Sequence, residues 1–108
     1  MDPAALRGFC LALPGAVEEF PFGEDVSVFK VGGKMFALAH LAGDPLRVSL
    51  KCEPQLGESL RTSYDAIVPG YHVNKRHWLT ITVDADADDT LVEGLLEDSY
   101  TLVAPRRR

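Results

Sequence analysis

The sequence feature that most constrains the fold is a pair of β-type segments, residues 26–31 and 34–39, separated by Gly32-Gly33. Two glycines between such segments predict a tight hairpin, because glycine tolerates the positive φ angles that two-residue hairpin turns require. This spacing pairs Val31 with Lys34 and Phe29 with Phe36. The face expected in the core carries Phe29, Val31, Phe36 and Leu38. The opposite face is expected to carry Val28, Lys30, Met35 and Ala37.

The rest of the chain alternates between helical and β-type patterns. Asp2 can cap a first helix whose apolar stripe ends before Pro14-Gly15, and Asp86 or Asp88 can cap a last helix. A short helix is expected to begin at Pro54. The expected strands cover 16–21, 46–51 and 78–83, and residues 67–76 are expected to form a loop. In segment 46–51, Leu46, Val48 and Leu50 alternate with Arg47, Ser49 and Lys51. In segment 78–83, Leu79, Ile81 and Val83 are expected to face inward, and Trp78, Thr80 and Thr82 outward.

This order of elements predicts an α+β fold, a twisted antiparallel β-sheet with helices packed on one face. The chain has 108 residues, of which 46% are hydrophobic and 25% are charged. Such a length and composition are typical of one globular domain, so residues 1–108 are expected to form a single domain.

Charge is distributed unevenly along the chain. The net charge of −5 argues against tight, indiscriminate binding to nucleic acid, which depends on neutralising phosphates. Residues 26–83, however, hold seven Lys or Arg and four Asp or Glu, a balance of +3, whereas the flanks hold four and twelve, a balance of −8. A mildly basic middle can orient a polyanion, and it is also what an ordinary solvated surface presents.

The remaining composition gives expectations about location and redox state. No apolar run approaches the ~20 residues of a membrane helix, and the first residues lack the pattern of a signal peptide. We therefore expect a cytoplasmic protein without membrane contact. Cys10 lies on an apolar helix face and Cys52 follows Lys51, and both are expected to be reduced packing residues.

Several segments together resemble a known family. They are Pro21-Phe22-Gly23, Phe29-Lys30-Val31, Lys34-Met35-Phe36-Ala37, Leu50-Lys51, the distinctive run from Pro69 to Trp78, and Ser99-Tyr100. In this order they resemble the MmcQ/YjbR family over nearly the whole chain. The resemblance implies a fold similar to the bacterial frataxin (CyaY) group. It also implies DNA as a possible partner, under a "double wing" idea in which sheet hairpins approach the duplex.

The strongest functional candidate is the segment 71–78, where cationic and aromatic side chains alternate. Lys75 and Arg76 suit phosphate contacts, and Trp78 suits stacking on a base, whereas a structural role for His77 or Asn74 is the alternative. Basic side chains on the sheet are expected to extend this surface. The full predicted nucleic-acid site is Lys30, Lys34, Arg47, Lys51, Tyr71, His72, Asn74, Lys75, Arg76, His77 and Trp78.

Two alternatives remain open at this point. The first is a module that binds a small ligand or a protein partner, with residues 69–78 forming one wall of a pocket. The second is frataxin-like metal binding, for which zinc-ligand spacing is missing and the acids before the last helix suit helix capping. Motifs for nucleophilic or phosphate-binding catalysis are absent from the sequence. The chain is therefore expected to be a monomer that is not an enzyme and holds no metal or cofactor.

Overall fold

A computed structural model describes residues 1–70 and 74–105 of the chain. Three helices and six strands occur in these residues. The helices are α1 (Pro3–Ala12), α2 (Pro54–Ser63) and α3 (Asp89–Val103). The strands are β1 (Val17–Glu19), β2 (Ser27–Val31), β3 (Lys34–Ala39), β4 (Arg47–Lys51), β5 (Ile67–Pro69) and β6 (Trp78–Thr82).

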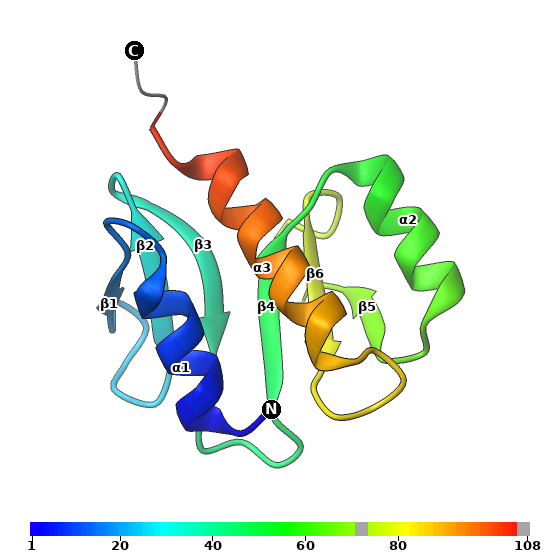
Figure 1. Ribbon diagram of the computed structural model, residues 1–108, viewed down its shortest axis with the longest axis horizontal. Coiled ribbons are helices and arrows are strands. Elements are labelled where there is room, and N and C mark those ends of the chain that lie inside the picture. The colour runs from blue at the N-terminus through cyan, green and yellow to red at the C-terminus, as the bar shows by residue number, and fades with distance from the viewer. Residues whose placement is uncertain (71–73, 106–108) are drawn as a thin grey trace.

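The strands form one antiparallel sheet in the order β1-β2-β3-β4-β6-β5. Helices α1 and α3 lie across the same side of this sheet, and α2 lies beside its β5 edge (Figure 1). Gly57 of α2 faces Leu79, a residue of the core, so α2 also approaches the sheet from the side of the helices. The predicted α+β architecture is confirmed.

Both predicted helix caps are present. Asp2 accepts a hydrogen bond of 2.7 Å from the backbone N–H of Ala5, and Asp88 accepts one of 2.9 Å from Leu91. Each carboxylate therefore satisfies an N–H group that a helix start leaves without a partner. Asp86, the other predicted cap, instead accepts from the N–H groups of Asp65 and Ala66 and fixes the start of β5.

The predicted register of the hairpin is right at the turn and wrong beyond it. Val31 pairs with Lys34 as expected, but Phe29 pairs with Ala37 because the register shifts between Phe29 and Lys30. Phe36 is the extra residue that this β-bulge inserts into β3. As a result Phe36 and Ala37 both enter the core, and Leu38 pairs with Val28 on the opposite face.

Two predicted segments have different boundaries. Residues 16–21 form only the short strand Val17–Glu19, and the expected loop 67–76 begins with the strand Ile67–Pro69. Pro69 could not donate a ladder hydrogen bond inside a sheet, which fits the place of β5 at its edge. The prediction missed β5 because three residues ending in proline give little periodicity.

The hydrophobic core lies between the helices and the sheet. Predicted alternation in β4 and β6 is confirmed, since Val48, Leu50, Leu79 and Ile81 are all buried in it. The core-facing helix residues include Leu6, Cys10, Val92, Leu95, Leu96 and Val103. In the described part of the chain, no helix is long and apolar enough to cross a membrane.

Candidate functional site

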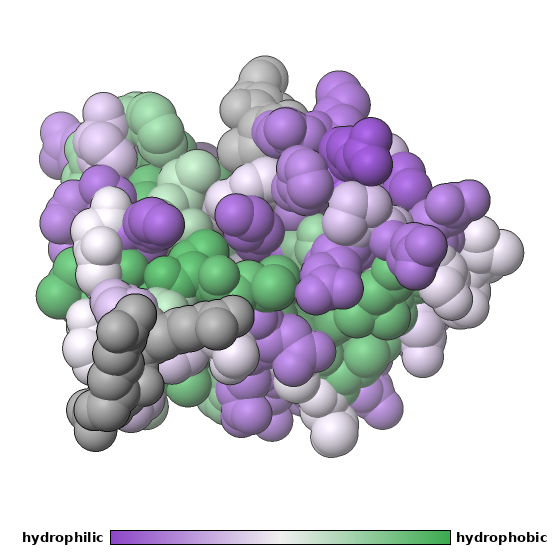
Figure 2. Space-filling view, turned by 90° about the horizontal axis from the view of Figure 1, so that it is seen from above, coloured by the Kyte–Doolittle hydropathy of each residue, from purple (hydrophilic) through white to green (hydrophobic). Residues whose placement is uncertain are grey.

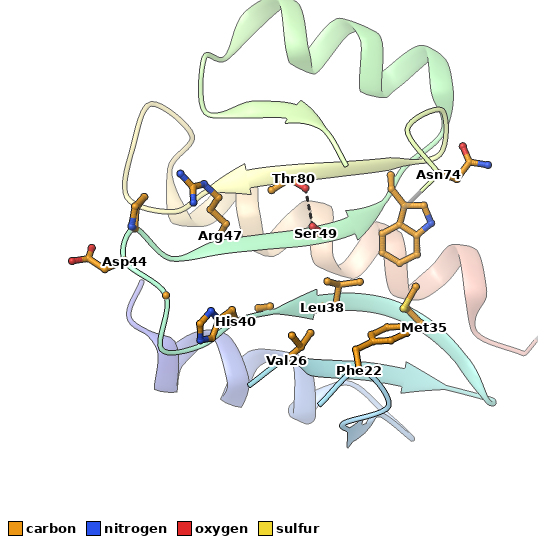
Figure 3. Close-up of a pocket in the computed structure, with 14 residues that line it drawn as sticks. Phe22, Val26, Met35, Leu38, His40, Asp44, Arg47, Ser49, Asn74 and Thr80 are labelled. Carbon is orange, nitrogen blue, oxygen red and sulfur yellow. Dashed lines mark hydrogen bonds between the residues drawn. The ribbon is translucent and has the colours of Figure 1, made fainter. Parts of the chain in front are cut away.

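The side of the sheet away from the helices carries a cleft with a volume of ≈ 910 Å³. Figure 3 shows the labelled lining side chains on strands β3, β4 and β6, on the segments that precede and follow the β2–β3 hairpin and, for Asn74, on the loop before β6. The apolar lining consists of Phe22, Val26, Met35, Leu38, Ala39, Pro45 and Trp78. The polar lining includes His40, Asp44, Arg47, Ser49, Asn74 and Thr80.

The floor of the cleft is formed by cross-strand neighbours. Leu38 pairs with Ser49 of β4, and Ser49 pairs with Thr80 of β6, so their side chains share the face. The hydroxyl groups of Ser49 and Thr80 lie 2.8 Å apart and are joined by a hydrogen bond, drawn as the dashed line in Figure 3. Both residues are buried, and this bond lets two polar side chains stand in a largely apolar floor.

The two ends of the cleft differ in character. Arg47, Asp44 and His40 lie together at one end in Figure 3, whereas Met35 and Phe22 lie at the other. Trp78 belongs to the second end, because it pairs with Lys51 at the end of β4 and Arg47 begins that strand. The cleft therefore joins a polar end to an aromatic end.

Arg47 is exposed, and no described carboxylate forms an ion pair with it. In residues 1–70 and 74–105, direct ion pairs join Arg7 to Glu18, Lys30 to Glu19, and the N-terminal amine to Asp84 and Asp89, and none includes Arg47. The side chain of Asp44, although close along the chain, points away from the cleft floor in Figure 3. An unpaired guanidinium at the end of an apolar cleft is suited to bind an anionic group.

Of the predicted site residues that the structure describes, three line this cleft. They are Arg47, Asn74 and Trp78. Trp78 is on the predicted face but only 8% exposed, so its ring is largely covered rather than free for stacking on a base. The Asn74 side chain accepts a hydrogen bond of 2.9 Å from the N–H of Arg76, which gives it the structural role named as the alternative.

Other predicted residues lie outside the cleft lining. Lys30 is half-buried and its Nζ lies 3.0 Å from a carboxylate oxygen of Glu19, so its charge is neutralised. The backbone carbonyl of His77 accepts from the N–H of Cys52. Tyr71 and His72 lie outside the described residues.

The remaining predicted cations gather at one end of the sheet. Lys34 begins β3, Lys51 ends β4, and Lys75 and Arg76 precede β6, which places all four at the end that carries Trp78. Figure 2 looks onto this end, and hydrophilic residues gather there mainly over the half that contains α2, with apolar surface beside them. Arg47 lies at the opposite end of β4, so the predicted cations do not form one continuous surface.

Sequence reasoning missed most of the apolar lining. Met35 was expected on the correct face but not as part of a site, and Leu38 was assigned to the core. The bulge at Phe36 turns Leu38 into the cleft, and no feature of the sequence marks that bulge. Phe22 gives a usable signal, because a Pro-Phe-Gly turn is expected at the surface, where a large apolar side chain indicates a binding site. In the structure Phe22 is 65% exposed.

The cysteines are buried and lie apart from the cleft. Burial raises the pKa of the Cys10 thiol from 9.0 to about 12, with a smaller contribution from the charge of Glu18. Burial also raises the pKa of Cys52, followed by the charges of Asp98 and Glu53. Neither thiol has the lowered pKa of a reactive cysteine. Among the described residues, no group of three or more His, Cys, Asp or Glu side chains is arranged to hold a metal ion.

Comparison with known proteins identifies the family. The family model named YjbR matches residues 11–102, which is most of the chain. The chain belongs to the YjbR family. It is 39% identical over 98 residues to the uncharacterized protein YbdF of Escherichia coli O157:H7, covering 90% of this chain and 80% of that protein. It is 32% identical over 100 residues to the uncharacterized protein YjbR of Escherichia coli strain K12, covering 93% and 85%.

Solved structures of similar proteins have the same fold. The crystal structure of Deinococcus radiodurans protein DR2400 is 44% identical and superposes with a TM-score of 0.88, covering 94% of this chain and 77% of that one. A crystal structure of a Pseudomonas syringae protein is 26% identical with a TM-score of 0.81, covering 95% and 99%. The YjbR relatives thus confirm the family and the architecture, and their names assign no activity.

Proposed function

We propose that this YjbR-family protein binds a small molecule in the cleft on the helix-free face of its sheet. The observation that carries this proposal is the cleft itself, with a volume of ≈ 910 Å³, a mostly apolar lining and a few polar groups. Small-molecule sites typically measure about 300–1,000 Å³ and combine apolar walls with a few polar side chains that orient the ligand.

Binding suits the cleft better than catalysis does. The hydroxyl group of Ser49 hydrogen-bonds Thr80 and not an imidazole or a carboxylate, so it lacks the adjacent base that activates a serine nucleophile. His40 lines the cleft but is exposed, and no oriented carboxylate contacts its ring in the described part of the chain. The polar groups are therefore placed to orient a ligand rather than to move protons.

A neutral apolar dye tests the cleft directly. Trp78 is the sole tryptophan of the chain and lines the cleft, so N-phenyl-naphthylamine bound there should accept its excitation energy. Met35→Arg, which places a charge in the wall, should abolish dye binding. Leu102→Arg, at an exposed leucine of α3, should leave dye binding intact. Circular dichroism melting checks that both variants fold. Absence of dye binding, or equal binding by both variants, would refute the proposal.

Nucleic-acid binding is the second candidate, and a specific observation favours it. Lys34, Lys51, Lys75 and Arg76 stand at one end of the sheet, and in the described residues none of them forms a direct ion pair. Unneutralised cations from three chain segments suit a phosphate backbone, whose contacts come mainly from lysine and arginine.

Titration of labelled duplex and single-stranded DNA separates this candidate from the first. Binding should weaken steeply with added salt, and replacing Lys51, Lys75 or Arg76 singly by Gln should weaken it further. Arg61→Gln, on α2, is the matched charge control, and it should have a much smaller effect. Absence of binding below about 100 μM at low salt would eliminate the nucleic-acid candidate and leave the cleft proposal unaffected.

A further inference from the structure

We propose that the ligand of the cleft is an amphiphilic carboxylate, a molecule with one aromatic or bulky apolar group and one carboxylate. This inference rests on the proposed small-molecule function and specifies its ligand class. Three features of the cleft lead to it: the unpaired cation at one end, the aromatic wall at the other, and the distance between them.

Arg47 is the expected partner of the ligand's anionic group. Its guanidinium is in no ion pair within the described residues, and Asp44 is directed away from the floor in Figure 3. A guanidinium can donate two parallel hydrogen bonds to a carboxylate, which gives orientation as well as affinity. Figure 3 places no second basic side chain other than His40 at this end, which favours one carboxylate over a multiply charged phosphate.

The ligand's apolar group is expected to bind at the opposite end of the cleft. Trp78 is only 8% exposed there, whereas Phe22 is 65% exposed and Met35 is half-buried. An exposed phenylalanine beside a thioether and an indole forms a surface on which an aromatic ring gains contact area and sulfur–aromatic contacts. No charged side chain among the described residues lines this end of the cleft, and Lys51, the strand partner of Trp78, lies outside the lining.

The length of the cleft limits the size of the ligand. Arg47 and Lys51, the partner of Trp78, are the first and last residues of β4, so their Cα atoms are separated by about 13 Å at the rise of an extended strand. The Arg47 side chain is long enough to swing along the cleft, so a bound carboxylate can lie closer to Trp78 than the Cα of Arg47 does. A phenyl ring and a carboxylate joined by a short chain therefore match the two ends. Between them the floor carries the hydrogen-bonded hydroxyl groups of Ser49 and Thr80.

Three probes with one carbon skeleton test the inference. Phenylpropanoate, phenylpropanol and phenylpropylamine differ only in the end group, and each is titrated against the dye-loaded full chain to displace N-phenyl-naphthylamine. The carboxylate should bind at least about tenfold more tightly than the alcohol, and the amine most weakly. Arg47→Gln should remove the preference for carboxylate over alcohol and leave the affinity for the alcohol unchanged. Arg61→Gln, outside the cleft, should keep the preference.

Other results of these titrations would contradict the carboxylate inference alone or small-molecule binding as well. Equal displacement by carboxylate and alcohol, with the dye bound in the cleft, would overturn the carboxylate inference and leave small-molecule binding standing. A carboxylate preference that persists in Arg47→Gln would also overturn it, because another cation would then be responsible. Failure of the dye and all three probes to bind would overturn both proposals together.

Discussion

Ser99 Oγ donates a hydrogen bond of 2.6 Å to the carbonyl oxygen of Phe36, the residue that forms the bulge in β3. The same hydroxyl accepts a bond of 2.8 Å from the N–H of Lys51 at the end of β4. A bulge interrupts the regular hydrogen bonds of a sheet and leaves backbone groups without strand partners. The helix α3 therefore supplies, through one serine, a bridge between β3 and β4 where the ladder is irregular.

Replacing this serine should destabilise the fold markedly. Ser99 is fully buried, so Ser99→Ala leaves the Phe36 carbonyl and the Lys51 N–H without their partner and should lower the free energy of unfolding by about 2–3 kcal/mol. Ser63→Ala, at the exposed end of α2, should change it by less than about 0.5 kcal/mol. Urea unfolding measures both. Equal effects of the two substitutions would show that the bridge contributes no specific stability.

The hydroxyl of Tyr100 should contribute separately from its ring. It donates to the carbonyl oxygen of Pro14, while the ring packs edge-on against Phe36 with centroids 5.5 Å apart. Tyr100→Phe keeps the ring contact and should cost about 1 kcal/mol. Tyr64→Phe is the control, since the Tyr64 hydroxyl has no hydrogen bond within the described residues. Thermal and urea unfolding should rank the wild type and Tyr64→Phe together, above Tyr100→Phe, and any other ranking contradicts the assigned role.

The two turn glycines should differ in their tolerance of alanine. Gly32 and Gly33 both have positive φ, +57° and +77°, so alanine at either position should cost about 1 kcal/mol. At Gly32 an added Cβ would also lie 2.5 Å from the Pro105 side chain, whereas at Gly33 it meets nothing within 4 Å. Gly32→Ala should therefore destabilise more than Gly33→Ala. Adding Pro105→Gly should remove the difference, and a double-mutant cycle of unfolding free energies tests this.

The Cys10 thiol should make stability sensitive to alkali. Its pKa in the folded protein is about 12 against an ordinary value of 9.0, so the folded chain keeps a proton that the unfolded chain releases. The stabilising contribution is complete below pH 9.0 and is lost as the pH rises toward about 12. From about pH 8 to about pH 10.5, the wild type should lose more unfolding free energy than Cys10→Ala. A parallel loss in both proteins would contradict the assignment.

Much of the fold follows from local patterns in the sequence. The alternation Leu46, Val48, Leu50 and the caps Asp2 and Asp88 have local physical causes, and the structure confirms them. The bulge at Phe36 has no such local cause. It depends on Ser99, 63 residues away, which supplies the bonds that make the irregular pairing acceptable. Long-range compensation of this kind leaves no periodic signal in a sequence.

The candidate site was less accessible to sequence reasoning than the fold. The sequence predicts Arg47 as a site residue from its charge, and Trp78 from an aromatic ring that suits stacking. Both residues line the cleft. The apolar wall was missed, because Leu38 is indistinguishable from a core residue until the register is known. The nucleic-acid assignment of the other cations stays a prediction.

The sheet ends on both sides in strands of only three residues, β1 and β5, and the last residue of β5 is Pro69. Another extended chain that approached either edge would find few backbone groups to pair with, and at Pro69 no N–H at all. Short edge strands and an edge proline therefore disfavour growth of the sheet by strand addition, the first step toward fibrils, while the helix-free face between the two edges stays open.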